Sequence, residues 1–133
     1  QTMTRLTDYT DIARQVAEEL TPRIECMLQA GIEGHQIVLD PGFGFAKEVE
    51  PSYRLIAGLD HLVALGYPIL VGISRKSMIT KALNIRKEDA LPATTALHWE
   101  LLRQGAAILR VHDVAAARQV VDLFNFYEKH CEQ

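Results

Sequence analysis

The segment IVLDPGFGFAK, residues 37–47, decides how the chain folds. It begins with three branched apolar residues, reaches the carboxylate of Asp40, and then turns through a proline, two glycines and two aromatic residues. Two later segments share this plan: ILVGISRKS at residues 69–77 and ILRVHDV at residues 108–114. Each is a short apolar run that delivers polar groups at its end and precedes a helical pattern, which indicates repeated βα units.

The spacing of these segments predicts a parallel sheet. The strand ends fall near Asp40, Ser74 and His112, about 34 and 38 residues apart, which fits right-handed βαβ units. A helix should precede the first strand, with a kink or restart near Thr21 because Pro22 cannot donate to the preceding turn. The expected elements are a helix from residue 12 to about 28, strands 36–39, 69–72 and 107–111, a helical turn or two at 77–83, and helices 51–65, 92–104 and 114–131.

Composition restricts the class of protein. The 133 residues are 48% hydrophobic and 23% charged, which is ordinary for one soluble domain. The net charge of -3 gives no electrostatic basis for nucleic acid binding, and no apolar run approaches the length of a membrane span. Cys26 and Cys131 lack metal-ligand spacing, so we interpret them as reduced thiols of a cytoplasmic protein.

The strand ends carry the residues that could bind a ligand. Parallel α/β folds bind ligands outside the carboxyl ends of their strands, so three separate segments should form one rim. The rim residues are Asp40, Lys47, Arg75, Lys76, Arg110 and His112. One carboxylate among several cations suits a ligand that has both a row of N–H donors and a strong negative charge.

Several of these residues have more than one interpretation. Asp40 could cap a helix, bind a metal or accept from paired N–H donors. Lys76 and Ser77 stand where a strand passes into a helix, which suits a carboxylate or phosphate but also a solvated loop. Arg110 and His112 share one strand face and could grip a diphosphate, although His112 could equally be structural.

The remaining polar and aromatic residues have structural interpretations. Arg75 is expected to form a salt bridge, and Asp113 to cap the last helix. Phe43 is expected in the core, whereas Phe45 could form the wall of a pocket. We expect the other histidines on loops or at the surface, and Trp99 in helix packing. Those histidines are His35, His61, His98 and His130.

The segments DPGFGFAK, GISRKSMI and ILRVHDV, in this order and spacing, closely resemble dihydropteroate synthase of folate biosynthesis. That family is a (β/α)₈ TIM barrel, a transferase that condenses 6-hydroxymethyl-7,8-dihydropterin diphosphate with p-aminobenzoate to 7,8-dihydropteroate and pyrophosphate. The resemblance runs over nearly the whole chain, residues 1–133. It implies an α/β fold of about three βα units plus a preceding helix, the C-terminal part of the barrel.

The resemblance also implies roles for matching residues. Asp40 would accept from the pterin ring and Lys76 would contact its O4/N5 edge, while Gly44 lets the pterin sit close. Arg110 would stack on the pterin and hold the diphosphate with His112. Two further residues would serve p-aminobenzoate: Phe45 as a pocket wall, and Ser77 at its carboxylate, the place that sulfonamides mimic.

The family's first strands have no counterpart in this sequence. The Asn that shares Mg²⁺ with the diphosphate belongs to that part, so the resemblance implies Mg²⁺ but no metal ligand in this chain. Three strands cannot close an eight-stranded barrel. We therefore expect a fragment with little or no activity alone, and a homodimer because the family dimerises through its last two helices.

Two other functions remain open. One is a pterin-binding methyltransferase that acts with a corrinoid protein; it would not need Lys76, Arg110 and His112 arranged for a diphosphate. The other is a non-catalytic half-barrel that dimerises. Mass in solution and binding of pterin diphosphate and p-aminobenzoate separate these functions.

Overall fold

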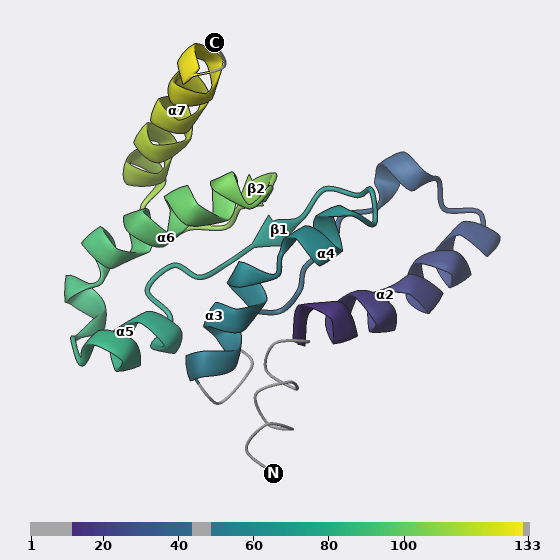
Figure 1. Ribbon diagram of the computed structural model, residues 1–133, viewed down its shortest axis with the longest axis horizontal. Coiled ribbons are helices and arrows are strands. Elements are labelled where there is room, and N and C mark those ends of the chain that lie inside the picture. The colour runs from purple at the N-terminus through teal and green to yellow at the C-terminus, as the bar shows by residue number, and fades with distance from the viewer. Residues whose placement is uncertain (1–11, 44–48, 132–133) are drawn as a thin grey trace.

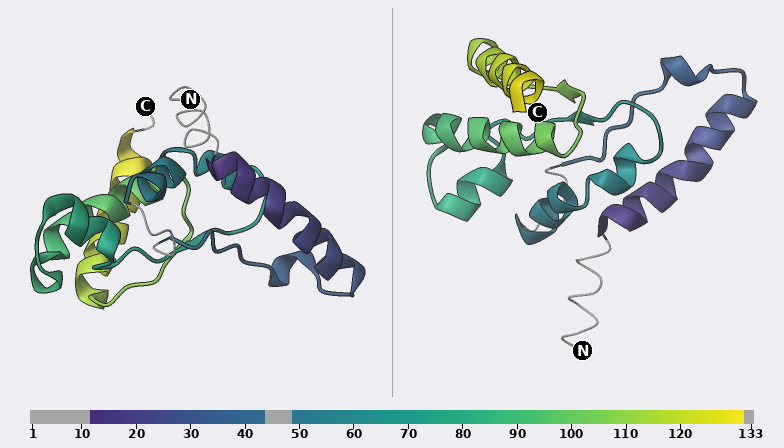
Figure 2. Two further views of the ribbon diagram at one scale, coloured as in Figure 1. Left: turned by 90° about the horizontal axis from the view of Figure 1, so that it is seen from below. Right: turned by 45° about the horizontal axis from the view of Figure 1, so that its top comes forward.

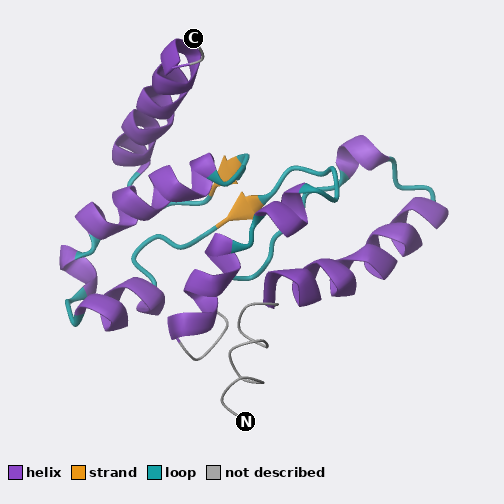
Figure 3. Cartoon of the chain, in the orientation of Figure 1, coloured by secondary structure: helices purple, strands orange, loops and turns teal. Residues whose placement is uncertain are grey.

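The computed structural model describes residues 12–43 and 49–131 (Figures 1 and 3). Within these ranges the chain alternates helices with very short strands. The elements are α2 (Ile12–Gln29), η1 (Gly34–Gln36), α3 (Val49–Ala57), α4 (Asp60–Val63), β1 (Leu70–Val71), α5 (Ser77–Leu83), η2 (Lys87–Asp89), α6 (Leu91–Arg103), β2 (Ile108–Leu109) and α7 (Val114–Cys131). The predicted bounds of α5 and α7 are confirmed.

The strands are parallel, as the spacing predicts. β1 pairs with β2 in the register Leu70 to Ile108 and Val71 to Leu109. On the other side of β1, Leu39 forms a parallel bridge with Ile69. The three predicted strand segments therefore lie side by side, with the segment that contains Leu39 on one side of β1 and β2 on the other. Each hydrogen-bonded stretch is shorter than the predicted strand.

The core fills the space between these strands and the helices α2 to α6. The largest fully buried side chains lie on and beside β1, in the turn after Leu39, and on or between the helices α3 to α6: Phe43, Leu59, Leu62, Ile69, Ile73, Ile79, Leu101, Val71 and Thr94. Phe43 is 2% exposed, so its predicted place in the core is confirmed. Burial of this kind supplies most of the stabilisation of a small domain.

α2 and α7 lie at opposite ends of the molecule, as Figures 1 and 2 show. α7 packs on α6, where Trp99 meets Phe124 edge-on at 5.2 Å between ring centroids and Tyr127 at 5.7 Å. The predicted packing role of Trp99 is therefore confirmed. Much of α7 stays open, with Leu123 60% and Phe126 63% exposed. In the described ranges, no helix combines the length and the apolar character that crossing a membrane requires.

One helix prediction is wrong. The predicted helix 51–65 is two helices, α3 and α4, separated at Gly58. A Cβ on Gly58 would lie 2.7 Å from the Cβ of Ala13, so α2 approaches the backbone too closely for a side chain there. Of the kink or restart predicted near Thr21, the restart does not occur: α2 runs as one helix through Pro22. The Thr21 hydroxyl donates to the Ala17 carbonyl at 2.9 Å.

Glycine sets the path from α6 into β2. Gly105 has φ +111°, the left-handed conformation that favours glycine after a helix. Its N–H donates to the Leu102 carbonyl at 3.0 Å and the Ala106 N–H to the Leu101 carbonyl at 2.9 Å, the pair of bonds of a Schellman motif. Because of this turn, β2 begins at Ile108, and Arg110 and His112 come after its last paired residue.

Candidate functional site

Residues just beyond the ends of β1 and β2 form a small polar cavity of about 210 Å³. Its lining contains three of the predicted rim residues together with two small residues that follow β1. The lining residues are Gly72, Ser74, Lys76, Arg110, Val111 and His112. The predicted convergence of Lys76, Arg110 and His112 is therefore confirmed. It follows from the parallel register, which brings the ends of neighbouring strands to one edge.

His112 is held by Ser74, a residue that the sequence analysis named only as a strand end. The His112 N–H donates to Ser74 Oγ at 3.3 Å, and His112 Nδ1 lies 2.9 Å from the same oxygen. Ser74 is only 3% exposed, whereas His112 is exposed at the cavity. A buried serine thus anchors an accessible imidazole.

Arg110 lies flat against the backbone of Gly72. A Cβ on Gly72 would lie 2.9 Å from both Nε and a terminal nitrogen of the guanidinium, so only glycine leaves this space. Arg110 itself is exposed in this chain. Gly72 is the second residue that sequence reasoning missed. Gly72 comes two residues before Ser74, just as Arg110 comes two residues before His112. Aligning these two pairs in parallel strands would have identified Gly72.

Lys76 connects the cavity to the turn after Leu39. Its Nζ donates to the Phe43 carbonyl at 2.9 Å. The pKa of Lys76 is lowered, first by burial and then by the positive charge of Arg110, while the carboxylate of Asp40 acts in the opposite direction. Asp40 and Arg110 are therefore both close enough to act on one ammonium group. Asp40 is exposed and accepts the Gly42 N–H at 2.9 Å.

Arg75 points away from the polar cavity, as predicted, and forms a salt bridge. Its Nε and a terminal nitrogen donate to the two carboxylate oxygens of Asp113 at 2.9 and 3.1 Å, and its third nitrogen donates to the Lys87 carbonyl at 2.8 Å. The guanidinium of Arg75 lowers the pKa of the Asp113 carboxyl. Asp113 precedes α7 and its carbonyl accepts the Ala117 N–H, but its carboxylate binds Arg75.

A second, more open cavity of about 420 Å³ adjoins the first and shares Ser74, Lys76 and His112 with it. Its lining includes Ser77, the exposed first residue of α5. The predicted pocket residues Gly44 and Phe45, and the rim residue Lys47, lie outside the described residues. In the described ranges, no cluster of three or more His, Cys, Asp or Glu side chains could hold a metal ion.

One histidine prediction is wrong. His98 is 2% exposed within α6 rather than at the surface, and neither ring nitrogen has a hydrogen-bond partner within the described ranges. Burial lowers the pKa of His98, which favours the neutral ring. It shares a helix face with the buried Thr94 and Leu101, so helical spacing from these residues could have identified it.

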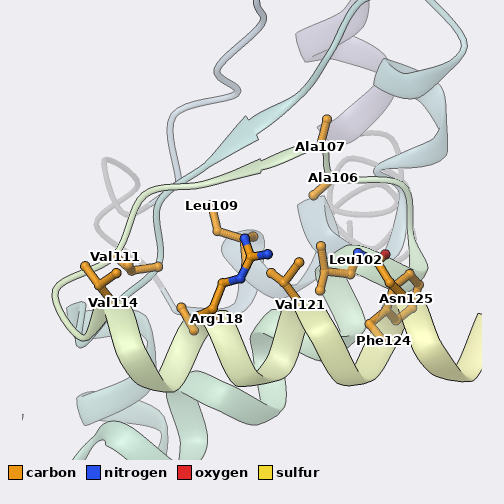
Figure 4. Close-up of a pocket in the computed structure, with 11 residues that line it drawn as sticks. Leu102, Ala106, Ala107, Leu109, Val111, Val114, Arg118, Val121, Phe124 and Asn125 are labelled. Carbon is orange, nitrogen blue, oxygen red and sulfur yellow. The ribbon is translucent and has the colours of Figure 1, made fainter.

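An apolar groove lies between β2, the end of α6 and α7 (Figure 4), and it shares Val111 with the polar cavity. Its volume is about 360 Å³. Figure 4 shows Leu109 from β2 opposite Val121 and Arg118 of α7. Most of its lining is apolar: Leu102, Ala106, Ala107, Leu109, Val111, Val114, Ala117, Val121 and Phe124, with Arg118 and Asn125. It offers packing surface rather than polar chemistry.

The family model described as "Pterin binding enzyme" matches residues 1–112, which include all three strand segments and every residue of the polar cavity. The chain belongs to the pterin binding enzyme family. Membership in this family agrees with the resemblance of the three motifs.

Curated relatives of this pterin binding enzyme chain are named dihydropteroate synthase. The protein from Streptococcus pyogenes is 40% identical over 115 residues, covering 85% of this chain and 43% of the relative. The protein from Synechocystis is 40% identical over 121 residues, covering 90% of this chain and 42% of the relative. The chain therefore spans less than half the length of these relatives.

Solved structures of dihydropteroate synthases share its fold. The Coxiella burnetii enzyme in complex with pteroic acid is 35% identical, with a TM-score of 0.85 over 91% of this chain and 45% of that one. The Yersinia pestis enzyme with a sulfonamide drug is 34% identical, with a TM-score of 0.84 over 90% and 43%. The Xanthomonas albilineans enzyme with 4-aminobenzoic acid is 36% identical, with a TM-score of 0.80 over 90% and 44%.

Proposed function

We propose that this chain is the C-terminal part of a dihydropteroate synthase, a transferase of folate biosynthesis. The complete enzyme would condense 6-hydroxymethyl-7,8-dihydropterin diphosphate with p-aminobenzoate to 7,8-dihydropteroate and pyrophosphate. The observation that carries this proposal is the cavity at the ends of β1 and β2, where Lys76, Arg110 and His112 meet. Three nitrogen-bearing side chains around about 210 Å³ suit a compact anion such as a diphosphate.

Each described site residue has a role in this reaction. Asp40 accepts from the N3–H and 2-amino group of the pterin, whose donor edge matches a carboxylate. Lys76 contacts the O4/N5 edge. Arg110 stacks on the pterin and, with His112, holds the diphosphate. Ser77 and the start of α5 meet the carboxylate of p-aminobenzoate. The roles of Gly44 and Phe45 stay predictions.

Catalysis needs no strong base in this scheme. The carbon–oxygen bond to the diphosphate breaks first, the cation that remains is delocalised into the dihydropterin, and the arylamine then attacks that carbon and loses a proton. Arg110, His112 and Lys76 stabilise the negative charge that develops on the leaving group, so electrostatic stabilisation and positioning do most of the work. The Mg²⁺ ligand is expected outside this chain, and both Mg²⁺ and the cytoplasmic location stay predictions.

The chain alone should have little or no synthase activity. Within residues 12–43 and 49–131, its strand segments form a row of three with no further strand at either end. Apolar side chains at those ends are accessible: Val38 is 47% and Ile108 is 39% exposed. Open strand edges of this kind are unfavourable unless further strands cover them. We propose that they are three consecutive units of a (β/α)₈ barrel, and that the domain continues beyond residues 1–133.

The first experiment measures pyrophosphate release from the two substrates by the purified chain, and then the binding of inorganic pyrophosphate by calorimetry. We expect negligible turnover but measurable binding. Arg110→Ala should weaken binding roughly 10- to 100-fold, the range for a lost hydrogen bond to a charged group. The control Arg86→Ala removes an exposed arginine that pairs with Asp89, outside the cavity, and should leave binding unchanged.

Normal turnover by the chain would contradict the proposed inactivity. Absence of pyrophosphate binding, or equal binding by the two arginine variants, would contradict the proposed site. A corrinoid-dependent methyltransferase has no need of a diphosphate grip, so it predicts a pterin ligand without pyrophosphate binding.

A dimerising half-barrel without catalysis is the second candidate, and the open face of α7 favours it. Leu123, Phe126 and Tyr127 are 60, 63 and 53% exposed on this helix. Self-association through the last two helices would cover such side chains. Sedimentation equilibrium of the chain and of Phe126→Ser decides: a dimer that weakens in the variant supports this interface, and a monomer in both contradicts it.

A further inference from the structure

If the register of β1 and β2 is continued past their last paired residues, the polar residues after β2 lie beside small residues after β1. Leu70 lies opposite Ile108 and Val71 opposite Leu109. Continued by one residue, this register places Gly72 beside Arg110, whose guanidinium covers it. Continued by three, it places Ser74 beside His112, where the two hydrogen bonds form. The contact between Ser74 and His112 is therefore part of the sheet geometry rather than a chance meeting of surface groups.

The hydrogen bonds of Ser74 determine where its proton goes. Its oxygen accepts the backbone N–H of His112 at 3.3 Å, and a backbone N–H can only donate. The hydroxyl proton then requires an acceptor, since Ser74 is buried and only 3% exposed to solvent. Across the described residues, the acceptor within reach is Nδ1 of His112, at 2.9 Å.

A neutral imidazole carries one proton, so an Nδ1 that accepts from Ser74 leaves that proton on Nε2. Nε2 lies on the side of the ring opposite Nδ1, and His112 lines the cavity with Lys76 and Arg110. The ring therefore offers an N–H donor to an anion there. The other tautomer would offer a lone pair, which an anion repels.

We propose that Ser74 is a positioning residue that holds neutral His112 as the Nε2–H tautomer, so that its free N–H points at the anion in the strand-end cavity. This inference rests on the proposed function for the identity of that anion, the diphosphate of the pterin substrate. The tautomer itself does not depend on that function. Ser74 touches no reacting atom in this scheme and acts through His112 alone.

The test reads the tautomer directly by long-range ¹H–¹⁵N NMR of the chain with labelled histidine at about pH 8, where an ordinary histidine is neutral. The His112 signals are assigned by their loss in His112→Asn. We expect unprotonated Nδ1 and protonated Nε2 in the unmodified chain. Ser74→Ala should shift His112 towards a mixture of both tautomers, and Ser74→Thr, which keeps the hydroxyl, should restore the original signals.

Ser52→Ala is the matched control, because Ser52 is equally buried at 3% exposed but belongs to α3. It should leave the His112 signals unchanged. A protonated Nδ1 in the unmodified chain overturns the proposal, even if Ser74→Ala fails to fold. Unchanged His112 signals in a folded Ser74→Ala variant overturn it too.

Titration with inorganic pyrophosphate separates this inference from the proposed function. Ser74→Ala should bind pyrophosphate about tenfold more weakly, as expected for one misdirected hydrogen bond to a charged group. If no form of the chain binds pyrophosphate, the proposed diphosphate site is wrong. The NMR measurement of the His112 tautomer then still tests the role of Ser74. If Ser74→Ala binds as well as the unmodified chain, the positioning role is overturned.

Discussion

The ends of β1 and β2 and the turn after Leu39 are neighbouring regions, but they are held in different ways. The first region has two links between side chains of neighbouring segments, Ser74 with His112 and Arg75 with Asp113. The turn at residues 40–43 is held by a local bond from the Gly42 N–H to Asp40 and by the buried ring of Phe43. Lys76 joins the two regions through the Phe43 carbonyl.

This difference separates the residues that meet a ligand from those that hold them. At the ends of β1 and β2, the supporting groups are small or point away from the cavity. Their loss should therefore change the geometry of the cavity more than the stability of the chain. In the turn, support comes from packing, so its loss should unfold the chain. Four predictions test the comparison, in order of expected effect.

The largest effect is expected for Phe43→Ala. Phe43 is 2% exposed, and truncating a buried phenylalanine costs about 3–5 kcal/mol through lost burial and a cavity. Urea denaturation should show that loss or an unfolded chain. Phe126→Ala, at a 63% exposed ring, is the control and should cost much less. Equal losses in the two variants would mean that the turn is not anchored by Phe43.

Gly72→Ala should weaken binding with little change in stability. The added Cβ would lie 2.9 Å from the guanidinium of Arg110, which is flexible and can move away. Pyrophosphate affinity should fall about tenfold, because the charged hydrogen bonds of Arg110 are misdirected. Gly34→Ala is the control, since its Cβ would meet Tyr67 at an ordinary 3.8 Å. An unchanged affinity for Gly72→Ala would show that the placement of Arg110 is not limiting.

Asp113→Asn should lower the melting temperature by a few degrees at neutral pH, since it removes the charge of a partly buried pair whose side chains are 19 and 30% exposed. The pKa of Asp113 is lowered in the folded chain from its ordinary value of 3.8. Its contribution is therefore complete above about pH 4 and is lost as the pH falls through the lower folded value.

Thermal melts of both chains between neutral pH and about pH 2 check this prediction. The two melting temperatures should converge in the acid range, below the ordinary Asp value. A difference that stays constant down to the lowest pH would mean that the carboxylate charge is not what stabilises the pair.

The smallest effect is on Lys76, and it sharpens the comparison because both regions act on this residue. Arg110 lowers the pKa of Lys76 and Asp40 raises it. Arg110→Ala should therefore raise that pKa, and Asp40→Asn should lower it further. NMR titration of the labelled lysine side chain measures both shifts, with Lys81, an exposed lysine of α5, as internal reference. If both substitutions shifted the pKa of Lys76 in the same direction, one of the two charges would not act on Lys76 as described.

Local patterns were sufficient for much of the fold and the site. α5 and α7 begin and end at the predicted residues, and the strand ends bring Lys76, Arg110 and His112 together as parallel strands require. These features depend on periodicity and on the direction of strands, which a single sequence records.

The features that sequence reasoning missed depend on contacts between distant segments. The division of residues 51–65 at Gly58 follows from the approach of Ala13. The burial of His98 follows from how α6 lies on the sheet. The roles of Gly72 and Ser74 require the register of β1 with β2, which is fixed by pairing and not by either strand alone.

That register also limits how this part of the gene can change in length. Deleting one residue between Gly105 and Arg110 would turn the side chains of Arg110 and His112 towards the helix layer and bring apolar neighbours to the cavity. Substitutions at these positions alter one group at a time, whereas a single-codon deletion would exchange the two faces at once. Viable insertions and deletions should therefore collect in the 84–90 connection between α5 and α6, where seven residues separate the two helices.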